Sequence, residues 1–186
     1  MEFTPTHIPG VFIIQPTVHS DSRGYFMETY SEREFSAHIG DIKFVQDNES
    51  RSSRGVVRGL HFQLPPHAQS KLVRCTEGTV LDVAVDLRKD SPTFGQHISV
   101  ELSAENKRQL FLPKGMAHGF AVLSEHATFV YKCDALYAPD FEGGIHPFDP
   151  ALGIDWQTNH EQAILSPKDL VRPLLADIKE SLTFKL

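Results

Sequence analysis

The sequence predicts an all-β protein, a sandwich or a barrel with only short helices. Short stretches rich in β-branched and aromatic residues follow one another along most of the chain, and turn residues separate them. Little of the chain carries helical signals, and no internal repeat or linker interrupts it. A length of 186 residues, with 40% hydrophobic and 23% charged side chains, suits one globular domain. We therefore expect a single domain over 1–186, with a β core at about 8–135 and a tail of loop and short helices at about 139–186.

The N-terminal third predicts two strands and one helix. They are a strand at 11–14, an aromatic strand at 25–30 after an Asp-Ser-Arg-Gly turn, and a helix from 32 to about 39. The helix follows a capping box, in which Ser31 precedes Glu34 by three positions, and it should end before Gly40. Residues 46–48 lie in a stretch that is half strand and half polar loop, and such residues most often form a turn.

The central stretch, 54–71, places charged side chains in a strand that is apolar enough to be buried. It reads as a strand at 55–63, followed by a loop that prolines interrupt. Arg58, His61 and, beyond the loop, Lys71 need partners there, because burying an unpaired charge is costly. A base that titrates near neutral pH beside fixed cations indicates a site for an anionic substrate. A structural salt-bridge network is the alternative.

Strict alternation within this strand raises a conflict. It places Arg58 on the face of Leu60 and Phe62, opposite His61. Both charged groups should reach one pocket if they serve one substrate. Gly59, which lies between them, predicts a bulge or a sharp twist that re-aims one of the two side chains.

The rest of the β core predicts six more strands. A strand at 71–75 turns at Glu77-Gly78 into a strand at 79–87, whose clean alternation indicates a hairpin. The other strands are expected at 97–102, 108–112, 120–123 and 128–133, with a turn at 113–119.

The C-terminal tail predicts a loop and then a helix. Glycines and prolines make 139–150 loop-like. Ser166 is a cap residue, followed by proline at the first helical position and an acid at the third. Leu170 and Val171 should then face inward.

Charge and cysteine content narrow the class of function. The net charge of −6 and a pI near 5.9 argue against nucleic-acid binding, although a local basic pocket could still bind a phosphorylated small molecule. Cys75 and Cys133 form no spaced pair of the kind that binds zinc. No signal peptide or membrane span is readable, so we expect a cytoplasmic protein that does not bind membranes.

The pattern P-x-G-x-x-H at 113–118 resembles the second short motif of the cupin superfamily, whose fold is a jelly-roll barrel. In metal-binding cupins His118 would be a ligand, and the first motif would supply two histidines two positions apart. Here the corresponding strand offers His61 and Gln63, followed by the cation of Lys71. A cation repels a metal ion and a third ligand is missing, so a metal-free, cofactor-free site is favoured over a metalloenzyme.

An ordered set of motifs over about residues 8–175 resembles the dTDP-4-dehydrorhamnose 3,5-epimerase family. The motifs are D-x-R-G-x-F-x-E at 21–28, Q-D-N-x-S at 46–50, G-x-x-R-G-L-H-F-Q at 55–63, K-L-V at 71–73, D-V-A-V-D-L-R at 82–88, P-K-G-M-A-H-G-F at 113–120, Y-K at 131–132 and S-x-K-D at 166–169. Members of this family are metal-free homodimers of cupin fold that act in deoxysugar synthesis. The resemblance therefore implies a cupin-type jelly-roll barrel with short flanking helices, assembled as a homodimer.

The implied reaction inverts C3 and C5 of dTDP-4-dehydro-6-deoxy-D-glucose through enolate intermediates, giving dTDP-4-dehydro-L-rhamnose. Inversion next to a ketone needs a base on one face, an acid on the other and support for the enolate oxygen. By family position, His61 is the base and Tyr131 the acid. Asp169 would fix the tautomer of His61, and Lys71 would stabilise the enolate. From spacing alone, a core aromatic is the favoured interpretation of Tyr131, and Asp169 could equally be a helix-capping acid.

The resemblance also implies residues that bind the substrate. Arg23 and Arg58 would bind the diphosphate, because the guanidinium fork suits phosphate oxygens. Phe26, Glu28 and Tyr137 would recognise thymine, with Tyr137 stacked on the ring. Further contacts would come from Gln46, Asn48, Gln63, His118, Glu142 and Lys168. Without the resemblance, His118 would be interpreted as a hydrogen-bonded structural histidine.

Local departures from the family keep other functions open. The chain has H-P-F-D-P at 146–150, where the family often has Trp-Asn-Asp or Trp-Asp-Asp before the proline, and it lacks a tyrosine at position 136. Inversion of only C3 or only C5 of a related sugar nucleotide is therefore an alternative. A metal-dependent cupin enzyme and a non-catalytic sugar-nucleotide binder are the remaining ones. In a homodimer, the edge strands near Val11 and Tyr25 should pair with the partner subunit.

Overall fold

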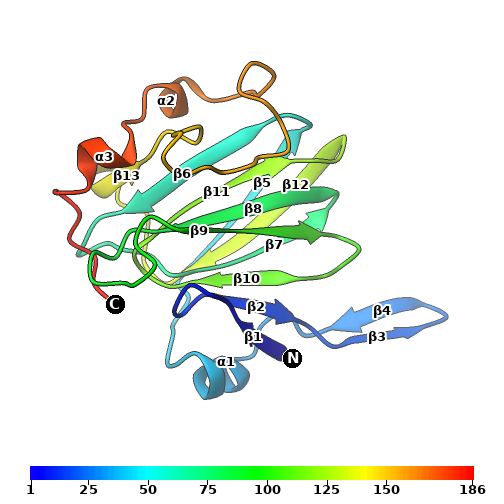
Figure 1. The fold of residues 1–186 in the computed structure, drawn as a ribbon. Helices are drawn as coiled ribbons and strands as arrows, with labels where there is room; N and C mark the ends of the chain where they lie inside the picture. Colours follow the sequence, from blue (N-terminus) through cyan, green and yellow to red (C-terminus); the bar gives the residue numbers. More distant parts are fainter.

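Two β-sheets face each other in the computed structural model, which describes residues 1–186 (Figure 1). The six-stranded sheet has the order β1-β2-β10-β7-β12-β5, and the five-stranded sheet has the order β13-β6-β11-β8-β9. The strands of the first sheet are β1 (Glu2–Pro5), β2 (Phe12–Gln15), β5 (Gln46–Ser53), β7 (Lys71–Glu77), β10 (Gln109–Leu112) and β12 (His126–Cys133). Those of the second are β6 (Val57–Gln63), β8 (Thr79–Asp86), β9 (His97–Ser103), β11 (Met116–Val122) and β13 (Glu142–Gly144). This all-β jelly roll confirms the predicted fold class.

The core between the sheets is built from the inward face of each strand. Val73 and Phe129 of the six-stranded sheet pack with Val80, Ala84 and Phe120 of the five-stranded sheet. Alternation along a strand sends every second side chain to the opposite face, so β8 buries a second row of residues on its outer side. Both faces of the five-stranded sheet are therefore covered.

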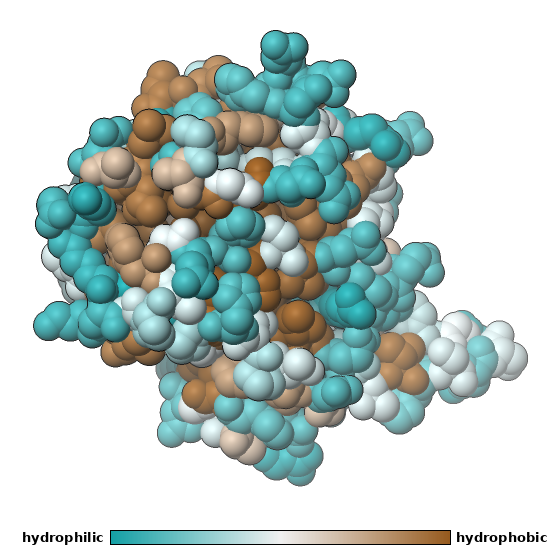
Figure 2. All heavy atoms as spheres, in the orientation of Figure 1, coloured by the Kyte–Doolittle hydropathy of each residue, from teal (hydrophilic) through white to brown (hydrophobic).

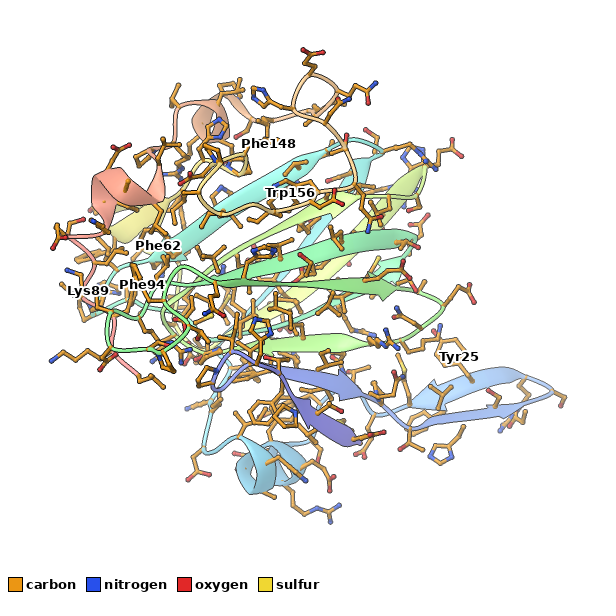
Figure 3. All side chains as sticks on the ribbon, in the orientation of Figure 1. Tyr25, Phe62, Lys89, Phe94, Phe148 and Trp156 are labelled. Atoms are coloured by element: carbon orange, nitrogen blue, oxygen red, sulfur yellow. The ribbon has the colours of Figure 1, made fainter.

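The C-terminal tail covers the outer face of the five-stranded sheet. Trp156, Leu175 and Phe184 pack against that face, and the indole Nε1 of Trp156 donates a hydrogen bond of 2.7 Å to the Pro147 carbonyl oxygen. Figure 3 shows Phe148 and Trp156 lying against this sheet. The tail includes a 3₁₀ turn at Pro139–Phe141 and two one-turn helices, α2 (Pro167–Leu170) and α3 (Leu175–Ile178). It thereby brings α2 next to β6.

The hairpin predicted at Glu77-Gly78 is wrong. β7 pairs with β10 and β12, whereas β8 pairs with β11 and β9, so the chain crosses from one sheet to the other at this turn. Gly78 has φ +74°, and a Cβ there would collide with the His126 backbone oxygen, so the turn is tight and needs glycine. Alternation had identified both strands correctly but carries no information about which strands pair.

Three segments that we predicted as turns or loops are strands. Residues 46–48 belong to β5, residues 116–119 belong to β11, and residues 142–144 form β13. β5 pairs along its whole length with β12 and exposes every second side chain, as a half-solvated edge strand does. Its polar sequence reflects that exposure and not a turn.

The helices lie where the sequence predicted them, but not every predicted contact forms. Helix α1 spans Glu32–His38, as predicted, yet Ser31 makes no side-chain cap. The Glu34 carboxylate lies instead 3.8 Å from the amino group of Met1, at the start of the chain. Ser166 does cap α2, since its Oγ accepts a 3.1 Å hydrogen bond from the Asp169 amide. Leu170 and Val171 do not face inward: Val171 is 80% exposed, because α2 is one turn long and directs Asp169 inward. No helix in this fold is long and apolar enough to cross a membrane.

A hairpin of β3 (Val18–Asp21) and β4 (Gly24–Met27) projects from the two sheets (Figure 1). It pairs with neither sheet. β2, near Val11, lies between β1 and β10, so our prediction that it is an edge strand is wrong. The open edges at the N-terminal end of the molecule are β1 and this hairpin. Figure 2 shows hydrophobic surface where this hairpin leaves the sheets, and both Tyr25 and Phe26 on the hairpin are exposed.

Candidate active site

A cavity of about 670 Å³ opens at one end of the barrel, between the two sheets. β5, β6, β7 and β12 contribute to its walls, and the tail closes its side with Ile164, Leu165 and the start of α2. Most of the predicted site residues line it: His61, Asp169, Tyr131, Lys71, Arg58, Gln46, Asn48, Gln63, Tyr137, Glu142 and Lys168. The structure therefore brings together residues that are up to 123 positions apart, from Gln46 to Asp169.

His61 and Asp169 form a hydrogen-bonded pair on one wall. The His61 Nε2 lies 2.6 Å from the Asp169 Oδ1, and Asp169 is only 2% exposed. Burial would raise the pKa of Asp169, but hydrogen bonds from His61, Ser166 and the backbone of Gly59 hold it below its ordinary value. An ionised carboxylate accepts the Nε2 proton, which leaves Nδ1 of the neutral ring as a free base.

Gly59 carries the bulge that the sequence predicted. His118 of β11 pairs with His61, and Phe120 pairs with Arg58. Two residues of β6 therefore lie between these pairs where β11 has only one, which is a bulge. Gly59 has φ +121°, and a Cβ there would lie 2.6 Å from the Cα of Gly119. The extra residue turns Arg58 to the same side as His61, and both line the cavity. Arg58 is held there by a 3.0 Å hydrogen bond from its Nε to the Ser52 Oγ.

Tyr131 and Lys71 come from the other sheet and so stand on the wall opposite His61. Burial raises the pKa of Tyr131, which keeps its hydroxyl protonated at neutral pH. Burial lowers the pKa of Lys71, which makes no ion pair within the chain. The Lys71 Nζ lies 5.8 Å from the centre of the Tyr131 ring, and Cys133 lies directly opposite Lys71 on β12. The cavity thus holds the Tyr131 phenol and the Lys71 amino group near each other on one wall.

His118 does not line the cavity, contrary to our expectation of a direct substrate contact. It is buried below, where its Nε2 lies 2.9 Å from the Asp82 Oδ2. The other carboxylate oxygen, Oδ1, has no hydrogen-bond partner. Burial raises the pKa of Asp82, and the nearby His118 and Lys71 oppose that rise. Sequence reasoning had given Asp82 no role.

Glu142 organises the rim of the cavity. The Tyr137 hydroxyl and the Lys168 Nζ each lie 2.6 Å from the Glu142 Oε2, and Arg172 binds Oε1. Partial burial would raise the pKa of this carboxylate, but the tyrosine hydroxyl and the two cations lower it to about 2. Arg172 escaped sequence reasoning because a lone arginine in a tail has no distinctive pattern.

This rim cluster predicts an acid-dependent contribution to stability. The pKa of Glu142 is lower in the folded chain, about 2, than its ordinary value of 4.5, so its stabilisation is complete above about pH 4.5 and is lost as pH falls towards 2. Urea unfolding at several pH values should show that Glu142→Gln flattens the fall in stability over this window. The exposed Glu105→Gln should leave the slope as in the wild type. Equal slopes for wild type and Glu142→Gln would contradict the assignment.

Besides His118, three predicted site residues lie away from the cavity of their own chain. Arg23 and Phe26 line a separate hollow on the β3–β4 hairpin, and Glu28 lies just beyond that hairpin. Arg23 has an 88% exposed side chain and pairs with Asp21 at 2.6 Å. These residues lie away from the cavity because the β3–β4 hairpin pairs with neither sheet and projects from them.

The residues around His61 do not resemble a metal centre. The histidine already binds Asp169, and the amide of Gln63 is used by backbone groups on both its ends. No cluster of three or more His, Cys, Asp or Glu side chains suited to a metal is present. That the site works without a metal stays a prediction.

Comparison with known proteins identifies one family. The family model described as dTDP-4-dehydrorhamnose 3,5-epimerase matches residues 5–177. A dTDP-4-dehydrorhamnose 3,5-epimerase from Salmonella typhimurium is 54% identical over 171 residues, which cover 91% of this chain and 93% of that protein.

Solved structures agree in fold. The crystal structure of dTDP-4-dehydrorhamnose 3,5-epimerase from Elizabethkingia anophelis has a TM-score of 0.92 at 52% identity, over 95% of this chain and 97% of that one. The dTDP-6-deoxy-D-glucose-3,5-epimerase from Legionella pneumophila, in complex with dTDP-4-keto-L-rhamnose, has a TM-score of 0.94 at 47% identity, over 100% of this chain and 98% of that one. The similarity includes the barrel and the tail that closes the cavity.

Proposed function

The chain belongs to the dTDP-4-dehydrorhamnose 3,5-epimerase family, and we propose that the cavity around His61 is where it performs the family's reaction. It is a carbohydrate isomerase that inverts C3 and C5 of dTDP-4-dehydro-6-deoxy-D-glucose in dTDP-L-rhamnose biosynthesis. One observation supports the site above all others. A histidine–aspartate pair and a protonated tyrosine face each other from different sheets across one cavity.

The proposed chemistry follows from these positions. The C4 ketone acidifies the hydrogens on C3 and C5, and the free Nδ1 of His61 removes one of them. Asp169 stabilises the imidazolium that forms. The ammonium of Lys71 stabilises the enolate oxygen, and Tyr131 protonates the carbon from the opposite face. Repetition at the second carbon completes the double inversion.

The remaining residues bind the nucleotide. Arg58 is free to bind the diphosphate, since its one hydrogen bond, from Nε, leaves the guanidinium tip unused. The half-exposed ring of Tyr137 is suited to stack on thymine at the rim. Lys168 and Glu142 neutralise each other beside it. A cytoplasmic location stays a prediction from the sequence.

Incubation with the 4-keto sugar nucleotide in D2O tests this function. NMR should locate deuterium at both C3 and C5 of the product. Deuterium at one carbon only would show a single-carbon epimerase, and no deuterium would show a non-catalytic binder. Activity that is lost on exhaustive chelation and restored by a divalent ion would show a metal-dependent enzyme.

We further propose that the protein is a homodimer in which the β3–β4 hairpin completes the partner's cavity. Arg23 and Phe26 match family positions for substrate binding but lie on a hairpin that pairs with neither sheet of its own chain. Phe26 is 69% exposed, and an exposed aromatic hairpin is favourable when another chain covers it. A second copy related by twofold symmetry would offer the same hairpin in return.

Purified heterodimers carrying two tags test this arrangement. One heterodimer joins a His61→Ala chain to an Arg23→Ala/Phe26→Ala chain, and it should keep about half of the wild-type activity, because one cavity has both His61 and an intact hairpin from its partner. The matched control carries all three substitutions on one chain beside a wild-type chain, and it should be almost inactive. The reverse pattern of activities would show that each hairpin serves its own chain, and a monomer in solution scattering would refute the dimer.

A further inference from the structure

The segment 135–138 carries Tyr137 at the rim of the cavity but belongs to no helix or strand. Its side chains at Leu136 and Tyr137 are 65% and 55% exposed, so packing of these side chains does little to hold it. Its backbone groups still need partners, because unpaired amides and carbonyls are costly where water is restricted. No backbone–backbone hydrogen bond reaches the amides of Tyr137 and Ala138 or the carbonyls of Ala135 and Leu136.

Three glutamine side chains supply those partners. The Gln69 Nε2 donates to the Ala135 carbonyl oxygen at 2.8 Å, and the Gln46 Oε1 accepts from the Tyr137 amide at 2.9 Å. Gln63 bonds the segment twice: its Nε2 donates to the Leu136 oxygen at 3.2 Å and its Oε1 accepts from the Ala138 amide at 2.8 Å. Every residue from 135 to 138 is therefore fixed by a glutamine.

Two of the three glutamines lie on strands of the barrel, and Gln69 lies in the loop just before β7. Gln46 starts β5, and its Nε2 donates to the Asn48 Oδ1 at 2.8 Å, which orients the amide. Gln63 ends β6, is 4% exposed, and also donates to the His67 carbonyl oxygen at 2.7 Å. A glutamine amide carries both a donor and an acceptor, so it can bind backbone groups of either kind at the end of a strand.

We propose that Gln46, Gln63 and Gln69 are positioning residues that hold Tyr137 ready to stack on the nucleotide base. This glutamine clamp rests on the proposed function, since it assigns the binding of the base to Tyr137. Ordering a free loop on binding reduces affinity, and a loop that is already ordered avoids that loss. The clamp therefore sets the affinity for the nucleotide and leaves proton transfer at His61 and Tyr131 largely unaffected. It also revises the expected role of Gln63, because both N–H donors of its amide are used by backbone carbonyls and its Oε1 already accepts from the Ala138 amide.

Affinity for dTDP, measured by calorimetry, tests the clamp. Gln69→Ala should weaken dTDP binding about tenfold, the loss expected when about one backbone residue must be ordered again. The deuterium exchange rate at saturating substrate should fall less than about twofold. Gln63→Met should have the same effect and should speed hydrogen exchange at the Ala138 amide. The matched control is Gln15→Ala on β2, outside the cavity. It removes a similar 3.0 Å hydrogen bond, from the Gln15 amide to the Asn106 carbonyl oxygen, and should leave dTDP affinity as in the wild type.

A double-mutant cycle with Tyr137→Ala separates the clamp from the function on which it rests. Tyr137→Ala alone should weaken dTDP binding, and Gln69→Ala should then add almost nothing, because the clamp acts through the ring. If Gln69→Ala weakens binding equally with and without Tyr137, or leaves it unchanged in the wild type, the clamp is refuted while base stacking stands. If Tyr137→Ala itself binds dTDP normally, the stacking role fails and the clamp fails with it.

Discussion

His61→Ala should abolish both inversion of the sugar and exchange of its hydrogens with solvent. The ring supplies the only free imidazole nitrogen that lines the cavity, and its partner Asp169 is too deeply buried to replace it. Without a base no enolate forms, so the loss should be at least ~10³-fold at both carbons. Incubation in D2O followed by NMR measures exchange and inversion in one experiment.

The control for this change is a histidine outside the cavity. His126→Ala removes an exposed ring on the opposite part of β12 and should keep wild-type exchange. The His61→Ala protein should still bind dTDP, because Arg58 and Tyr137 are intact. Exchange at either carbon that persists in His61→Ala at more than about one-tenth of the wild-type rate would show that another group removes the proton.

The local features of this chain could be predicted because they depend on residues close in sequence. Glycine is the residue that tolerates a positive φ, so Gly59 identified the bulge that brings Arg58 and His61 to one cavity. The cap at Ser166 was predictable for the same reason, since a hydroxyl three positions before an amide can reach it. Motif order then assigned His61 and Asp169 to one site, and the 2.6 Å contact is consistent with that assignment.

Features that depend on distant segments could not be predicted. Alternation identified the strands at 71–75 and 79–87, but their pairing depends on which neighbours complete each sheet, and the crossing at Gly78 has no local signal. For the same reason the sequence did not predict that the β3–β4 hairpin projects from the sheets. The residues around Arg23 would be the same whether Arg23 contacts its own chain or a partner. Arg172 and Gln69 were missed for a different reason. Each is an ordinary polar residue whose role arises only from the carboxylate or carbonyl it meets in the fold.

In the proposed mechanism, inversion needs groups from both sheets. A single strand presents its functional groups to one side of a ligand, so one sheet alone would return a proton to the face from which it came. The jelly roll places His61 on the five-stranded sheet and Tyr131 on the six-stranded sheet, with the cavity between them. Lys71 lies on β7, the strand next to that of Tyr131. From there its side chain can stabilise charge on the ketone oxygen during proton transfer at His61 and at Tyr131.

Tyr131→Phe should therefore separate exchange from inversion. The substitution removes only the hydroxyl, which makes no hydrogen bond within the chain, and it keeps the ring packed against Phe129. His61 can still remove a proton and return a solvent-derived one to the same face. NMR in D2O should then show deuterium at C3 or C5 with retained configuration, and inverted product reduced by ~10²-fold or more, as for loss of a general acid.

Tyr30→Phe is the matched control for this change, because its hydroxyl donates to the Ile42 carbonyl oxygen away from the cavity and its loss should not alter the ratio of exchange to inversion. The ratio is the informative quantity, since a general loss of stability would lower both rates together. Inversion by Tyr131→Phe at the wild-type rate would assign the acid to another group or to water. Tyr131 would then be a core aromatic, and another group in the cavity would have to donate the proton to the face opposite His61.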